Sequence, residues 1–280
     1  MPPTNPSTIA SIYNERSTAY DTATFHHRLA EEYIRAAAPQ PGARVLDLAC
    51  GTGLVAFRAE AQVGPTGYVV GVDISEGMLE VAREKAQRTG SRISFYQHDI
   101  SDLTGLNLNP HPGGESDGTG QFDLITCAAA LVLLPDPLGA IRHWASLLRE
   151  GGRLVTDVAA RDVHVPARIF ERIGPELGLS LQWDQSWVKG EESLAELLRE
   201  AGLEVERVYL SPVLQVKEHK VEQAGDLFEQ AVSGPMFRNF GVGRVRDEAK
   251  RLFVQRFVGE AGEGVLVDEA KMYIGVAVKR

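Results

Sequence analysis

The sequence predicts an α/β fold in which a largely parallel sheet carries helices on both faces. Short apolar runs typical of buried strands alternate with segments of helical periodicity, which is the order that a parallel sheet requires. A glycine-rich turn follows the first of these strands, at the strand end where open sheets of this class bind ligands. The chain has 280 residues, of which 44% are hydrophobic, and this suits one sizeable domain with insertions.

The predicted elements follow one another regularly from Thr24 onward. A helix is expected over Thr24–Ala37, where Leu29, Tyr33 and Ile34 recur at helical spacing. Two prolines and a glycine in residues 39–42 end this helix. We then expect strands over residues 44–49, 68–73, 93–98, 122–127, 153–158, 204–209 and 272–278, and helices over residues 54–62, 75–89, 138–149 and 193–201.

Several segments lie outside this alternation. Residues 1–10 are rich in proline and serine and are expected to be disordered or loosely docked, whereas residues 103–120 predict a long surface loop. Residues 161–190 and 212–265 form two larger insertions. Their aromatic side chains either pack the insertions onto the core or line a cavity beneath a lid, and we expect at least one to line a cavity. These large side chains are Trp183, Trp187, Phe228, Met236, Phe237 and Phe240.

Charge and composition exclude several classes of protein. The net charge of −9 argues against nucleic-acid partners, which require clustered lysine and arginine. The two cysteines, Cys50 and Cys127, cannot build a disulfide framework and lack the neighbours of a metal site, so no metal is expected. No secretory signal and no apolar run of membrane-spanning length is present in the sequence. We therefore expect a cytoplasmic enzyme that has no membrane partner.

The turn after the first predicted strand is the main candidate binding site. In the run VLDLACGTG (residues 45–53), Gly51 and Gly53 permit a tight turn and a close approach of ligand to backbone. Together with Ala56 they also satisfy the loose dinucleotide fingerprint, which alone is a weak signal. Asp47 distinguishes the possible ligands, because its carboxylate repels a pyrophosphate and attracts a cation. The turn therefore predicts a site for a nucleoside that carries an amino acid with ammonium and sulfonium groups.

Carboxylates also end the next two predicted strands. Asp73 lies 20 residues after Gly53, where a carboxylate can accept hydrogen bonds from both hydroxyls of a ribose. Asp99 can accept from an adenine amino group, while Ile100 offers its backbone N–H. Each aspartate also has a simpler alternative role: Asp47 or Asp99 would cap a helix or turn, and Asp73 would form a turn at the strand end.

Five motifs together carry a family resemblance. They are VLDLACGTG (45–53), VVGVDIS (69–75), SFYQHDI (94–100), FDLITCAAALVLLPDP (122–137) and LLREGGRLVTDV (147–158). In these motifs the chain resembles the class I S-adenosylmethionine-dependent methyltransferases of the ubiquinone/menaquinone, or methyltransferase 11-like, group. The resemblance implies a Rossmann-like sheet of seven strands whose last strand is antiparallel. It also implies an N-terminal helical lid (1–38), a cofactor-binding core (39–160) and a remainder (161–280) that holds strands six and seven with the lid insertions at 161–190 and 212–265.

The same resemblance implies how S-adenosyl-L-methionine is bound. The backbone of Ala49 and Gly51 would lie against the amino-acid part of the cofactor, and Asp73 would hold the ribose. Many members have glycine where this chain has Ala49, and alanine is widely tolerated there. The complete expected cofactor set is Tyr20, which would cover the cofactor, with Asp47, Ala49, Gly51, Gly53, Asp73, Ile74, Met78, Asp99, Ile100 and Cys127, the last through its backbone.

Two histidines are candidate catalytic bases. A base is required only if the acceptor atom carries a proton at the working pH, as in an alcohol or phenol. His26 falls on the apolar face of the first predicted helix, and His164 follows the fifth predicted strand at the mouth of the expected acceptor cavity. The alternative interpretations are a packed core histidine for His26 and an ordinary loop histidine for His164.

The expected reaction is methyl transfer to O, N or C of a hydrophobic small molecule, such as a specialised metabolite. Three alternatives remain open at this point. One is a cyclase or pericyclase that uses S-adenosylmethionine without consuming it, and another is a non-catalytic cofactor-binding partner. A nicotinamide enzyme is the least favoured, because Asp47 would face a phosphate. The sequence identifies neither the acceptor nor the oligomeric state.

Overall fold

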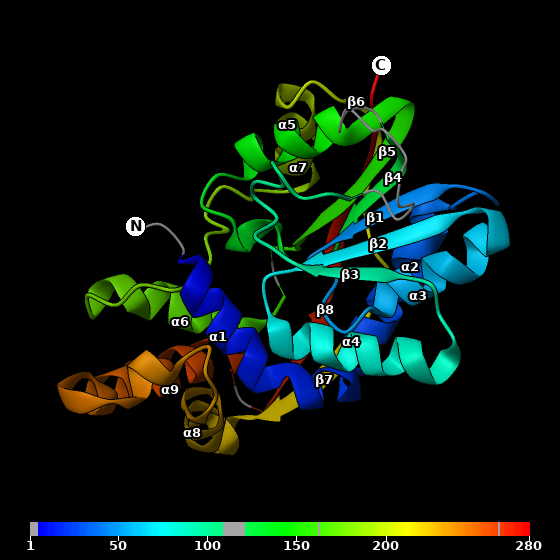
Figure 1. Cartoon of the computed structure of the whole chain (residues 1–280). Coiled ribbons are helices and arrows are strands. Elements are labelled where there is room, and N and C mark those ends of the chain that lie inside the picture. Colours follow the sequence, from blue (N-terminus) through cyan, green and yellow to red (C-terminus); the bar gives the residue numbers. More distant parts are fainter. Residues whose placement is uncertain (1–4, 109–120, 162, 263) are drawn as a thin grey trace.

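The computed structural model describes residues 5–108, 121–161, 163–262 and 264–280, and its centre is a seven-stranded sheet (Figure 1). The strand order is β3-β2-β1-β4-β5-β9-β6, and β9 runs antiparallel to β5 and β6 while the other pairings are parallel. This confirms the predicted Rossmann-like fold class. The strands are β1 (Arg44–Leu48), β2 (Tyr68–Asp73), β3 (Ser94–Gln97), β4 (Phe122–Cys127), β5 (Leu148–Ala159), β6 (Glu204–Leu210) and β9 (Met272–Val278).

Helices cover both faces of this sheet because successive strand side chains point to opposite sides. Leu46 and Leu48 of β1 contribute to a core with Trp144 on α5. Val45 faces the other way and joins a core with Tyr33 on α2. The helices around the sheet are α2 (Thr24–Ala37), α3 (Leu54–Val63), α4 (Glu76–Thr89), α5 (Pro137–Leu147) and α7 (Glu191–Glu200).

A third core lies away from the sheet and is built from aromatic rings. Its centre is Phe170, whose ring lies 4.9 Å from that of Phe253 and 4.8 Å from that of Phe240. Figure 1 shows α6, α8 and α9 gathered at one end of the molecule. We call this unit the lid core. Its helices are α6 (Val165–Glu176), α8 (Ala224–Ser233) and α9 (Arg246–Ala261), with the short helical turns η4 (Val221–Gln223), η5 (Arg238–Gly241) and η6 (Gly243–Val245).

The aromatic side chains of the two insertions pack into the protein and do not line the cleft at the carboxyl end of the sheet. Phe228 and Phe240 are completely buried in the lid core, and Trp183 and Phe237 pack against it. Trp187 packs against the sheet core instead.

A small second sheet was not expected from the sequence. It joins β7 (Gln215–Lys220) to β8 (Val265–Ala270) in antiparallel register. Leu266 and Asp268 of β8 are buried, whereas Val265 and Val267 are exposed, so one face of this sheet is turned toward the protein. The pairing joins segments about fifty residues apart in sequence, which local patterns do not reveal.

The N-terminal segment is ordered where it was expected to be loose. Asn5 caps α1 (Pro6–Arg16) by accepting a hydrogen bond from the Ser7 N–H, and Pro6 suits the first helical turn. The turn η1 (Ser17–Thr22) connects α1 to α2. The expectation for residues 1–10 is therefore wrong for residues 5–10, while residues 1–4 lie outside the described residues.

Two further expectations are answered in part. Residues 103–108 of the predicted long loop contain no helix or strand, and residues 109–120 lie outside the described part of the chain. Among the described helices, none is both long enough and apolar enough to cross a bilayer. The remaining short turns are η2 (Gly64–Thr66) and η3 (Leu131–Leu133).

Candidate functional site

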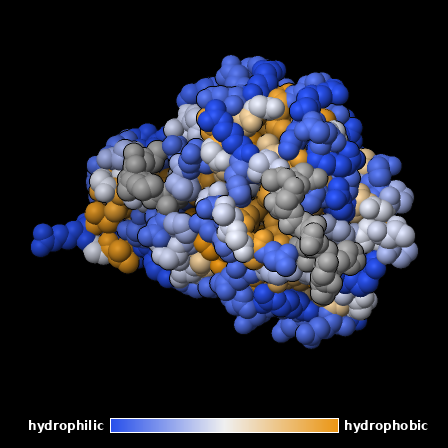
Figure 2. Space-filling model, turned by 45° about the horizontal axis from the view of Figure 1, so that its top comes forward, coloured by the Kyte–Doolittle hydropathy of each residue, from blue (hydrophilic) through white to orange (hydrophobic). Residues whose placement is uncertain are grey.

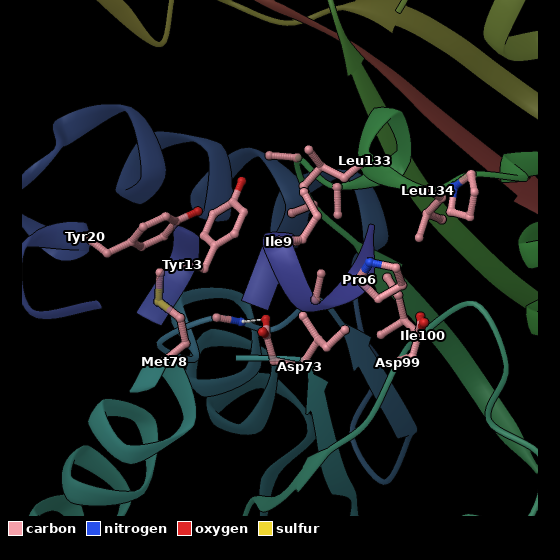
Figure 3. A pocket seen from close by; sticks show the side chains of 17 residues that line it. Pro6, Ile9, Tyr13, Tyr20, Asp73, Met78, Asp99, Ile100, Leu133 and Leu134 are labelled. Atoms are coloured by element: carbon pink, nitrogen blue, oxygen red, sulfur yellow. Dashed lines mark hydrogen bonds between the residues drawn. The ribbon is translucent and has the colours of Figure 1, made fainter. Parts of the chain in front are cut away.

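A cleft with about 710 Å³ of empty space lies at the carboxyl ends of β1, β2 and β4 (Figure 3). Figure 3 shows Tyr13 and Tyr20 close together at one end of it, with Asp73 in the floor and Asp99 and Ile100 at the other end. Seen from outside, the face in Figure 2 is mainly hydrophilic, with separate hydrophobic groups near its centre and at one end. The remaining lining residues carry no charge and are mostly apolar: Pro6, Ile9, Ala49, Gly51, Ile74, Met78, Ala128, Ala129, Ala130, Leu133, Leu134 and Pro135.

The turn between β1 and α3 has the backbone conformation that its glycines predict. Gly51 and Gly53 have φ angles of 52° and 85°, a left-handed region that side chains disfavour. Ala49 adopts φ 50° and therefore holds backbone strain at the cleft. Gly53 does not line the cleft; a Cβ there would lie 2.7 Å from Cε2 of Phe57. Gly53 thus shapes the turn, whereas Ala49 and Gly51 line the cleft.

Asp47 lies at the floor of a second, smaller chamber beside this turn. The side chain is 1% exposed, and its Oδ1 accepts a hydrogen bond from Thr126 Oγ1 at 2.7 Å. Its Oδ2 is buried and has no hydrogen-bond partner among the described residues. Burial raises the pKa of this carboxyl to about 7. Tyr20 and Ala49 line the same chamber. An ammonium group bound in this chamber would pair with the unpartnered Oδ2 of Asp47.

Asp73 is held rigidly in the floor of the main cleft. Its Oδ2 accepts from the Gly51 N–H and its Oδ1 from the Ser75 N–H, both at 2.8 Å. Each carboxylate oxygen keeps accepting capacity for a further donor, such as a ribose hydroxyl. Burial raises the pKa of this carboxyl.

Asp99 forms the turn contact that was its alternative role, and it also lines the cleft. Its Oδ1 accepts from the N–H and the hydroxyl of Ser101, at 2.9 and 2.8 Å, which is the turn-forming role. The residue nevertheless lines the cleft next to Ile100, and no hydrogen bond to its Oδ2 is present within the described residues. Ile74 and Met78 line the cleft as well.

Cys127 lies behind the cleft wall rather than in it. It is completely buried, and its carbonyl oxygen accepts from the Tyr33 hydroxyl at 2.7 Å and from Thr156 Oγ1 at 3.1 Å. Residues 128–130, which come next in the chain, line the cleft instead. The part of the chain that lines the cleft therefore begins one residue after Cys127, the residue expected to border the cofactor.

Asp157 supports this wall and was not singled out from the sequence. Its Oδ1 accepts from the Ala129 N–H at 2.9 Å, and Ala129 has a left-handed φ of 54°. Its Oδ2 is buried without a partner among the described residues, and burial raises the pKa of this carboxyl to about 7. The sequence signal was an aspartate at the carboxyl end of the apolar strand β5.

The N-terminal segment is fastened over the cleft by polar contacts. Asn14 Oδ1 accepts from Ser75 Oγ at 2.7 Å and from the Gly77 N–H at 2.9 Å, at the beginning of α4. Asp21 Oδ1 accepts from Thr52 Oγ1 at 2.5 Å, and its other oxygen forms an ion pair with Lys85. These contacts hold α1 and η1 where Pro6, Ile9 and Tyr13 become part of the lining. The sequence analysis missed Pro6 and Ile9 because it treated residues 1–10 as loose, and it did not single out Tyr13.

The two candidate bases, His26 and His164, both contact the ring of Phe25. The His26 ring stacks on Tyr20 with centroids 3.9 Å apart and lines the chamber of Asp47. Burial lowers the pKa of His26 to about 4 and also lowers the pKa of His164. The Phe25 ring contacts both imidazoles, at 5.3 Å from His26 and 5.7 Å from His164. His164 does not line either chamber described above.

Known proteins resemble this chain in sequence. Residues 39–202 match the family model described as a methyltransferase domain. Aklanonic acid methyltransferase DauC from Streptomyces sp. (strain C5) is 32% identical over 149 residues, which cover 52% of this chain and 62% of that protein. A ubiquinone biosynthesis O-methyltransferase from Xanthomonas axonopodis pv. citri is 32% identical over 183 residues, covering 63% of this chain and 69% of the relative.

Solved structures agree in fold. A protein of Bacillus halodurans C-125 has a TM-score of 0.60 at 20% identity and covers 89% of this chain and 98% of its own. The [4+2]-cyclase SpnF has a TM-score of 0.56 at 19% identity, with 90% and 81% coverage. At these identities the likeness concerns the fold alone. Because the family model matches more than half of the chain, the chain belongs to the class I S-adenosylmethionine-dependent methyltransferases.

Proposed function

We propose that this protein transfers the methyl group of S-adenosylmethionine to O, N or C of a hydrophobic small molecule, such as a specialised metabolite. The observation that carries the proposal is the unpartnered, buried Oδ2 of Asp47 in a chamber next to the aromatic-covered cleft. A ligand with a positive charge satisfies this oxygen, whereas a pyrophosphate would be repelled. DauC and the ubiquinone-pathway relatives are named for small organic molecules, which favours an acceptor of that class.

The residues of the cleft and of the smaller chamber beside it offer a contact for each part of this cofactor. Asp47 would meet its ammonium group, and Asp73 would accept from its ribose hydroxyls. Asp99 and Ile100 would contact the adenine edge, with Ile74 and Met78 beside the ring. When bound, S-adenosylmethionine supplies an electrophilic methyl group on a positively charged sulfur, which becomes neutral as the methyl leaves.

The protein's own contribution to rate would be alignment and exclusion of water. Tyr13 and Tyr20 cover the cleft from α1 and η1, and the surrounding wall is apolar. Holding the acceptor in line with the methyl group in a dry cavity supplies a large part of the acceleration in a displacement of this type. Acceleration by alignment and exclusion of water requires no charged catalytic side chain.

His26 is the better placed of the two candidate bases. It lines the chamber of Asp47, and its lowered pKa keeps the imidazole neutral at physiological pH. A neutral imidazole can accept a hydrogen bond from an acceptor hydroxyl. If it serves as the base, His26→Asn will lower kcat/KM for phenolic acceptors far more than for acceptors that carry no proton, and His164→Asn will have the smaller effect.

The function is tested by incubating the protein with methyl-labelled S-adenosylmethionine and a panel of hydrophobic phenols, acids and amines. We expect label in an acceptor together with an equal amount of S-adenosylhomocysteine. Tight cofactor binding without any transfer would contradict the proposal. Unconsumed cofactor beside a rearranged product would instead support the cyclase alternative. Calorimetric titration with NAD(H), which we expect not to bind, checks that the site repels a pyrophosphate as the charge of Asp47 requires.

A further inference from the structure

Thr126 contacts the carboxyl that faces the smaller chamber but does not line the chamber itself. In the register of the main sheet, Thr126 of β4 lies beside Asp47 of β1, so the two side chains project from the same face. Thr126 is completely buried, and its Oγ1 lies 2.7 Å from Asp47 Oδ1. Because Thr126 belongs to the lining of neither hollow, its effect on a ligand must pass through Asp47.

The hydrogen bond between these side chains has one possible direction once Asp47 is ionised. A carboxylate can only accept, so the Thr126 hydroxyl donates to Oδ1. The other oxygen, Oδ2, is buried without a hydrogen-bond partner among the described residues, and Asp47 lines the chamber. Thr126 therefore engages one oxygen of the carboxylate and leaves the other available to a ligand.

The same hydrogen bond favours the charged form of Asp47. Burial raises the pKa of this carboxyl to about 7, and the Thr126 hydrogen bond is the largest of the interactions that oppose the rise, ahead of the Ala56 N–H. Hydrogen bonds to charged groups contribute more than those between neutral groups. Removing the Thr126 hydroxyl should therefore raise the pKa further, and a protonated Asp47 forms no ion pair with an ammonium group.

The other titratable groups around Asp47 are His26 of α2, Tyr20 of η1, Cys50 of the turn and Asp73 of β2. Burial lowers the pKa of His26 to about 4 and raises the pKa values of Tyr20 and Cys50. These three groups are therefore uncharged between pH 7 and 8.5. Asp73 accepts from two backbone N–H groups of its own, those of Gly51 and Ser75.

We propose, on the basis of the cofactor placement proposed above, that Thr126 is a positioning residue for S-adenosylmethionine: it orients the Asp47 carboxylate and keeps it charged to receive the ammonium group of the cofactor. The effect is selective, because only ligands that carry this ammonium group pair with Asp47. S-adenosylhomocysteine carries it, whereas 5′-methylthioadenosine has the nucleoside and lacks the amino acid. The two ligands therefore separate this role of Thr126 from a general weakening of the cleft.

The experiment is calorimetric titration of both ligands into the wild-type protein, Thr126→Val and Thr126→Ser. Valine has the shape of threonine without its hydroxyl, so Thr126→Val should weaken the Kd of S-adenosylhomocysteine about tenfold at pH 7. The Kd of 5′-methylthioadenosine should stay within about twofold of wild type, because this ligand makes no ion pair with Asp47. Serine keeps the hydroxyl, so Thr126→Ser should bind both ligands as the wild-type protein does.

Thr156→Val is the matched control. Thr156 is also completely buried, and its Oγ1 donates to the Cys127 carbonyl oxygen at 3.1 Å, where the Tyr33 hydroxyl donates as well. This variant loses the same kind of hydroxyl from the neighbouring strand β5 without removing a donor from Asp47. It should change the Kd of neither ligand.

Two further measurements distinguish positioning from a structural role. At pH 8.5 more of Asp47 is ionised in the variant, so the loss in Thr126→Val should shrink to about threefold. In the Asp47→Asn background, Thr126→Val should change the Kd of S-adenosylhomocysteine by less than about twofold, because the charge on which the hydroxyl acts is absent.

The outcomes separate this inference from the function beneath it. The inference is overturned by equal losses for both ligands in Thr126→Val, by an unchanged Kd of S-adenosylhomocysteine in that variant, or by a loss as large in Thr126→Ser. An unaltered Kd of S-adenosylhomocysteine in Asp47→Asn overturns both the placement of the ammonium group and the role of Thr126. Absence of methyl transfer to every acceptor contradicts the proposed function alone, because these titrations measure binding.

Discussion

The carboxyl edge of the sheet and the lid core are held together by different forces. At the edge, Ala49 and Ala129 have left-handed backbone angles, and Asp47 and Asp157 each bury an oxygen without a partner among the described residues. The lid core contains stacked and edge-on phenylalanine rings around Phe170. The edge therefore contains strained backbone and unpaired polar atoms that lower the stability of the ligand-free protein, whereas the lid core is stabilised by close packing of apolar rings. Substitutions in the two regions should separate stability from cofactor binding.

The largest effect is expected from Phe253→Ala in the lid core. The side chain is completely buried and contacts the rings of Phe170, Phe228 and Phe257. Removing it leaves a cavity, and we expect a loss of about 3–5 kcal/mol in the free energy of unfolding of the lid core. Denaturant unfolding and hydrogen exchange measure this loss, and calorimetry should give a cofactor Kd within about threefold of wild type. A cofactor Kd weakened as much as stability would show that the two regions are not independent.

The same division explains what the sequence could predict. The strand and helix order, and about half of the residues that line the cleft, depend on local patterns. Asp47 and Asp73 lie at the ends of β1 and β2, and Gly51 and Asp99 closely follow the ends of β1 and β3. These positions converge because parallel strands end at one edge. Residues at such positions can be predicted without knowing which distant segments are in contact.

The missed features depend on contacts between distant segments. The pairing of β7 with β8 joins residues 215–220 to residues 265–270, and the docking of α1 depends on Asn14 meeting the beginning of α4. Composition alone suggested disorder for residues 1–10, because the capping of α1 by Asn5 was not recognised. Asp157 was missed because its contact, the Ala129 N–H, lies on another strand's loop.

A second prediction concerns protons released when the cofactor binds. Asp47 in the free protein has a pKa of about 7, so at pH 6 its carboxyl is mostly protonated. A bound ammonium group would favour the carboxylate and lower that pKa. Binding at pH 6 should therefore release up to about one proton, and little at pH 8.5, as measured by calorimetry in buffers of different ionisation enthalpy.

Asp47→Asn should abolish this release and weaken cofactor binding by about 30-fold or more. Asp157→Asn is the matched control, since it removes an equally buried carboxyl and should leave most of the release intact. The folded pKa of Asp47 exceeds its ordinary value of 3.8, so burial of its charge destabilises the free protein as pH rises from about 4 to 7. Asp47→Asn should flatten that part of the stability profile. If Asp47→Asn releases as many protons as the wild-type protein, another group must lose the proton and pair with the ammonium group of the cofactor.

The smallest expected effect is at the contact that fastens α1 over the cleft. Asn14→Ala removes the acceptor of two hydrogen bonds, from Ser75 Oγ and the Gly77 N–H. The loss of roughly 1 kcal/mol should raise the cofactor dissociation rate about fivefold, measured by stopped-flow displacement, with a smaller change in the association rate. Asn239→Ala removes a comparable side-chain hydrogen bond, to the Ser180 carbonyl outside the cleft, and should leave both rates unchanged. Equal dissociation rates in the two variants would mean that α1 stays in place without Asn14, and that the apolar contacts of Ile9 and Tyr13 hold the cover closed.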